Sequence, residues 1–120
     1  DSSGHRATLG RGTMMLINSG RGFSHEESAL AAPVEMLQIF IRPEEADLAP
    51  QVQIQQLGWP PPKDEWRPLV GPKGSDFPLT VQQEIRILDR ICENDSTVMT
   101  PAWDGHESFL YVASGEITME

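Results

Sequence analysis

Residues 78–91 read Pro-Leu-Thr-Val-Gln-Gln-Glu-Ile-Arg-Ile-Leu-Asp-Arg-Ile, and apolar side chains recur along this stretch with a period of two. The apolar set comprises Leu79, Val81, Ile85, Ile87 and Ile91, with Thr80, Gln82, Glu84 and Arg86 on the opposite face. Successive side chains of a β-strand point to opposite faces, so this pattern is typical of a sheet with one buried face. The stretch therefore predicts β-structure rather than a helix.

Strand patterns continue on both sides of this stretch. We predict further strands over 13–17, 34–41 and 51–57, and a hairpin formed by 109–113 and 116–119 around Ser114-Gly115. No stretch of ten or more residues has a clean 3.6-residue period. Many short strands separated by glycine and proline favour an all-β sandwich or barrel.

The length of 120 residues suits one domain, 1–120, with a single core. Within it, residues 1–57 and 78–120 are both rich in strand patterns, and 58–77 separates them. This middle stretch contains the triplet Pro60-Pro61-Pro62, which favours an extended conformation and cannot join a sheet ladder. We therefore interpret 58–77 as a proline-rich connector.

Composition argues against two classes of partner. The formal net charge of −9 repels phosphate backbones, so we expect no nucleic-acid partner. No apolar run approaches the roughly 20 residues needed to span a bilayer, so we expect no membrane partner. A single cysteine, Cys92, forms no intramolecular disulfide, and no signal-peptide pattern is found, so we expect a cytoplasmic protein.

Two glycine-spaced strings resemble a known family. Residues 9–27 read LGRGTMMLINSGRGFSHEE, which resembles the second half of the first cupin domain of pirins. Residues 78–84 (PLTVQQE) and 105–117 (GHESFLYVASGEI) resemble the opening strands of a pirin-like second cupin. The chain thus resembles a rearranged or truncated pirin-like protein of the cupin superfamily. This resemblance implies a cupin-type jelly-roll β-barrel.

The same resemblance implies a metal site. In pirins an H-x-E pair supplies metal ligands, and here that pair falls on His25 and Glu27, with His106 as a possible third ligand. Such ligands suit a divalent metal such as Fe, Ni, Cu or Mn. However, Pro101 and Trp103 occupy the positions of the family's H-x-H pair, and neither side chain ligates a metal. The resemblance therefore implies a degraded metal site.

Two functions follow as expectations. The first is a non-catalytic or small-molecule-binding cupin that needs no cofactor, with Trp103 and Tyr111 lining the pocket. The second, the alternative, is a metal-dependent dioxygenase of the quercetinase type that uses the residual His/Glu site. Residues 1–57 resemble the end of a cupin and residues 78–120 the start of one, so the two halves stand in inverted order relative to a single barrel. A barrel would then be circularly permuted, or it would be completed by strand exchange in a homodimer or other self-association.

Overall fold

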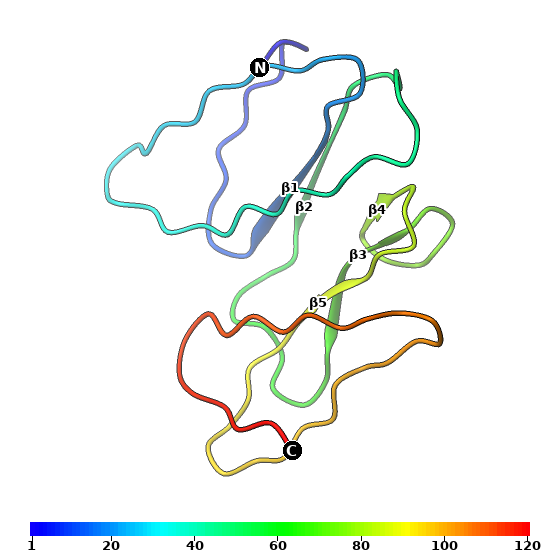
Figure 1. Ribbon diagram of the computed structural model, residues 1–120. Helices are drawn as coiled ribbons and strands as arrows, with labels where there is room; N and C mark the ends of the chain where they lie inside the picture. The colour runs from blue at the N-terminus through cyan, green and yellow to red at the C-terminus, as the bar shows by residue number, and fades with distance from the viewer.

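The computed structural model describes residues 1–120 and contains five β-strands in two small sheets, with no helix (Figure 1). In the first sheet, β1 (Thr13–Asn18) pairs antiparallel with β2 (Gln51–Gln56). In the second, β3 (Arg67–Pro72) lies between β4 (Leu79–Val81) and β5 (Ile87–Asp89). The prediction of an all-β protein is confirmed, and the two sheets do not close into a barrel. No helix of the length and apolarity required to cross a lipid bilayer is present.

The core sits where the two sheets meet. It consists of Leu69 and Val70 from β3 and Leu79 from β4. The partly buried side chains that pack against this core are Met14, Leu16, Leu57, Val81 and Ile87. Burial of these apolar groups makes the main favourable contribution to the free energy of folding.

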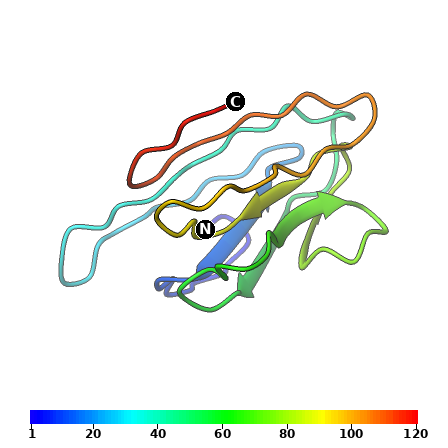
Figure 2. The same cartoon turned by 90° about the horizontal axis from the view of Figure 1, so that it is seen from below.

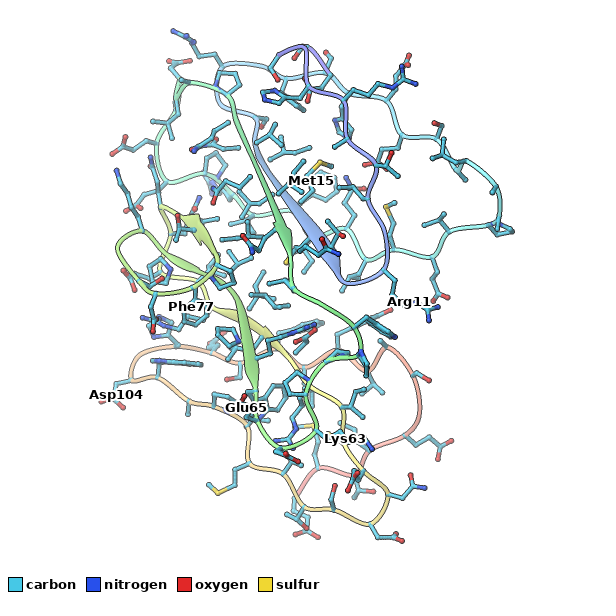
Figure 3. The ribbon with its side chains drawn as sticks, turned by 180° about the vertical axis from the view of Figure 1, so that it is seen from behind. Arg11, Met15, Lys63, Glu65, Phe77 and Asp104 are labelled. Atoms are coloured by element: carbon cyan, nitrogen blue, oxygen red, sulfur yellow. The ribbon has the colours of Figure 1, made fainter.

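The most buried strand, β3, lies inside residues 58–77, which the sequence predicts to be a connector. Its apolar pair Leu69-Val70 lies between Pro68 and Pro72. These prolines are why the stretch does not have the sequence pattern of a strand. Proline is tolerated near strand ends, where no ladder donor is required. At Gly71 an added Cβ would lie 2.5 Å from the Phe77 ring, so glycine allows Phe77 to fold back across β3 (Figure 3).

A glutamine side chain joins the two sheets. Gln53 of β2 lies opposite Leu16 of β1, on the face that looks toward the core. The Gln53 amide donates to the Thr80 carbonyl at 2.8 Å and accepts from the Thr80 N–H at 3.1 Å. The Gln53 side chain therefore pairs with the backbone of β4, an edge strand, in the way that a further strand would.

An arginine makes the second link between the sheets. Arg67 of β3 donates two parallel bonds to the Asp89 carboxylate of β5, at 2.9 and 2.7 Å. Its remaining donor group reaches the carbonyls of Leu57 and Gly58, both at 2.9 Å, in the chain that follows β2. Hydrogen bonding to Asp89 raises the pKa of Arg67 above its ordinary value, against a smaller opposing effect of desolvation.

Long segments lie outside the sheets. The predicted strands over 34–41, 109–113 and 116–119 are extended chain without ladder partners. The radius of gyration is 16.0 Å, whereas a compact chain of this length has a value of about 14 Å. The two chain ends lie at opposite ends of the molecule (Figure 1), so within one chain Glu120 does not come near Asp1.

Candidate functional site

His25 and Glu27 lie together on an extended stretch after β1. The His25 Nε2 atom is 3.4 Å from a Glu27 carboxylate oxygen. Residues i and i+2 of an extended chain share one side, which is why the two side chains meet and Glu26 does not join them. Both side chains are partly open to solvent. The pair supplies one nitrogen and one carboxylate donor on a single side of the chain.

The N-terminal residues hold this stretch in place. The Ser2 N–H donates to the Ser24 carbonyl at 2.7 Å, and the Ser24 N–H donates to the Ser2 hydroxyl at 3.0 Å. The Phe23 and His25 rings are tilted against each other with centroids 5.8 Å apart. The position of His25 is therefore set by contacts on both sides of it.

His106 belongs to a different part of the molecule. Its Nδ1 atom lies 3.0 Å from the Asp104 carbonyl, in a loop at the edge of the molecule (Figure 3). Its Nε2 atom lies 3.1 Å from the Glu84 carbonyl and 3.3 Å from an Arg86 nitrogen. Both ring nitrogens are thus within hydrogen-bonding distance of protein groups. A metal bound by His106 would have to displace one of these partners.

Of the three metal ligands predicted from the sequence, His25 and Glu27 lie together and His106 lies apart from them. No group of three or more His, Cys, Asp or Glu side chains converges in the chain. A catalytic metal site of the usual kind takes three protein ligands and keeps one position open. His25 and Glu27 fit two of these ligands, but the donor set of a single chain does not fit the complete site.

Trp103 and Tyr111 line one broad concave surface that is open to solvent, and His106 lies along the same surface. The Arg86 guanidinium lies over the Trp103 ring, 5.1 Å from its centroid. Arg86 also approaches the Glu84 carboxylate at 3.5 Å. The surface thus combines an aromatic ring with an adjacent cation and acceptor groups.

No sequence pattern indicates the roles of Arg86, Arg67 and Asp89. Arg86 lies on the polar face of the 78–91 pattern, where an arginine is indistinguishable from any solvated charge. Arg67 and Asp89 are 22 positions apart in the sequence, and no local pattern predicts a contact between residues so far apart. Alternation indicates which face each residue occupies, but not its partner.

Comparison with known proteins adds no relative, since no protein-family model, curated protein or solved structure matches this chain.

Proposed function

We propose that the chain is a pirin-like, cupin-derived β-protein that binds a small planar molecule without catalysing its conversion. The observation that supports this proposal is the separation of His106 from the His25–Glu27 pair. Trp103, in contrast, lies under the Arg86 guanidinium, and Tyr111 lines the same broad open surface. An aromatic face next to a guanidinium suits a flat ligand that carries hydroxyl or carboxylate groups.

The first test uses quercetin as a planar probe. We expect quercetin to quench tryptophan emission saturably, and we expect EDTA to leave the affinity unchanged, because no metal takes part. Replacing Trp103 with alanine is expected to weaken binding about tenfold, the loss of one stacked ring. Isothermal titration calorimetry provides the same comparison without relying on fluorescence.

Trp59→Ala is the matched control for this test. Trp59 also lies under an arginine, with the Arg11 guanidinium 5.1 Å from its ring centroid. Trp59 lines part of the concave surface, but its ring lies under Arg11, whereas the Trp103 ring lies under Arg86. Equal loss of quercetin affinity in Trp59→Ala and Trp103→Ala would contradict binding beside Arg86, and loss of binding in EDTA would contradict a metal-free mode.

The alternative is a metal-dependent dioxygenase of the quercetinase type, and the contact between His25 and Glu27 favours it. In that function the pair would hold a divalent metal such as Fe, Ni, Cu or Mn, which would supply redox chemistry. His25 and Glu27 would contribute two donors to such a metal. The remaining ligands would have to come from outside this pair.

Elemental analysis separates the two functions. For the proposed binding protein we expect less than stoichiometric metal after incubation with iron, nickel, copper or manganese, and no change in His25→Ala. His5→Ala is the matched control, because the His5 side chain hydrogen-bonds to Ser3 in its own N-terminal turn and lies apart from Glu27. A stoichiometric metal that is lost in His25→Ala and kept in His5→Ala would establish the alternative instead.

A further inference from the structure

Two extended segments of the chain have no backbone partners. We call residues 29–41 the first free segment and residues 107–119 the second free segment. Neither takes part in a strand ladder or in any other backbone–backbone hydrogen bond. The whole chain makes 26 such bonds, whereas a folded domain of 120 residues makes about 80. Most of the missing backbone hydrogen bonds belong to residues outside the two sheets.

The free segments carry most of the exposed large apolar side chains. In the first segment these are Leu30, Val34, Met36, Leu37, Ile39 and Phe40. In the second they are Phe109, Leu110, Tyr111, Val112, Ile117 and Met119. Only Glu35, Glu107 and Glu116 are charged within the two segments. Apolar surface of this extent on a soluble protein marks an interaction surface.

The two free segments also share one side of the molecule. Figure 2 shows both of them on the same side of the two sheets. Residues 37–41 of the first segment and 109–119 of the second line the same concave surface. One partner of matching shape can therefore contact both segments at once.

The exposed area is large enough for a stable dimer. The chain exposes 10033 Å², whereas a compact monomer of 13.3 kDa exposes about 6,500 Å². If two copies each covered half of this excess, the interface would bury about 3,500 Å² in total, within the range of obligate dimers. A single added strand would cover only one of the two segments.

We propose that two copies of this chain associate about a two-fold axis, with the first free segment of each copy pairing with the second free segment of the other. A two-fold axis makes the contact reciprocal, so both segments of both copies gain a partner. The pairing supplies ladder partners to strand-like sequence that lacks them and buries its apolar side chains. Tyr111 belongs to the second free segment, so this assembly covers part of the surface proposed to bind the ligand. Its formation requires neither the ligand nor a metal.

The test is the mass of the purified protein in solution, measured by light scattering during size-exclusion chromatography. We expect twice the 13.3 kDa of one chain. Phe40→Lys and Phe109→Lys are each expected to raise the dissociation constant by about 100-fold or more, since each buried aromatic is present twice. These side chains are 87% and 92% exposed within one chain, so the substitutions leave its own packing intact.

Met99→Lys is the matched control, because Met99 is also 87% exposed but lies outside both free segments. It is expected to remain a dimer. Because each copy carries a net charge of −9, added salt should strengthen the association by screening repulsion. A wild-type mass of 13.3 kDa at all concentrations would overturn the proposal, as would open-ended oligomers or a Phe40→Lys variant that dimerises like Met99→Lys.

Hydrogen–deuterium exchange provides a second readout that also detects unfolding. Amides of both free segments should be protected in the wild type, because the ladder between copies would bond them. Phe109 lies in the second free segment, yet Phe109→Lys should also remove protection from the amides of the first free segment, because the two segments pair between copies. The amides of β3 should stay protected. Equal exchange of the free segments in the wild type and in Phe109→Lys would contradict reciprocal pairing.

Discussion

Replacing Leu79 with alanine is expected to destabilise the protein more than any other truncation of an aliphatic side chain. Leu79 is 2% exposed and is one of only three buried apolar residues in the core. Such truncations cost about 2–5 kcal/mol, from lost burial and from the cavity that remains. Because domains of this size unfold at the cost of about 5–15 kcal/mol, we expect a large unfolded fraction at 37 °C.

Urea unfolding, followed by circular dichroism at one protein concentration, measures this effect. A fixed concentration is needed because association contributes to the apparent stability. Leu9→Ala serves as the control, since it removes the same atoms from a side chain that is exposed and outside the core. We expect Leu9→Ala to cost less than about 1 kcal/mol. Similar losses in the two variants would mean that β3 and β4 do not form the core.

Replacing Arg67 with methionine is expected to have the second largest effect. Methionine keeps much of the apolar stem but leaves the Asp89 carboxylate and two carbonyls without their donor. We expect a cost of about 2 kcal/mol, because an unpaired, partly buried acceptor loses more than the net value of one hydrogen bond. Solvent reaches part of Asp89, which keeps the cost below that of a fully buried pair.

Lys63→Met is the matched control for the arginine. Lys63 pairs with Glu93 at 3.0 Å, but both side chains are largely exposed. Surface pairs of this kind contribute about 0.2–1 kcal/mol. A double-mutant cycle of Arg67→Met with Asp89→Asn isolates the pairwise energy. If Arg67→Met and Lys63→Met cost the same, the bidentate contact does not stabilise the fold.

The arginine also sets an expectation for pH dependence. A raised folded-state pKa contributes stability that is fully present below the unfolded-state pKa and is lost as the pH rises through the folded-state value. The ordinary guanidinium pKa already lies above the range in which proteins are handled, and Asp89 raises it further. Arg67 therefore remains charged, and mild alkali should not reduce the cost of Arg67→Met.

The sequence alone determined the all-β class and the positions of β1 and β2. The stretch 78–91, predicted as continuous β-structure, forms two short strands, Leu79–Val81 and Ile87–Asp89, on either side of β3. A short apolar run between Gly12 and Asn18 identified β1, and alternation identified β2. Alternation also placed Gln53 on the opposite face from Val52 and Ile54. The adjacency of His25 and Glu27 followed from the same period, since an extended chain puts i and i+2 on one side.

Tertiary structure alone decided the remaining features. The strand β3 gains its ladder from β4 and β5, so two prolines did not prevent it from forming the core. The predicted strands over 34–41, 109–113 and 116–119 do not form, because these residues have no backbone partner within the chain. Local sequence sets which face of a strand is apolar. A strand forms only where a second backbone supplies the hydrogen bonds, and that depends on contacts between distant parts of the chain.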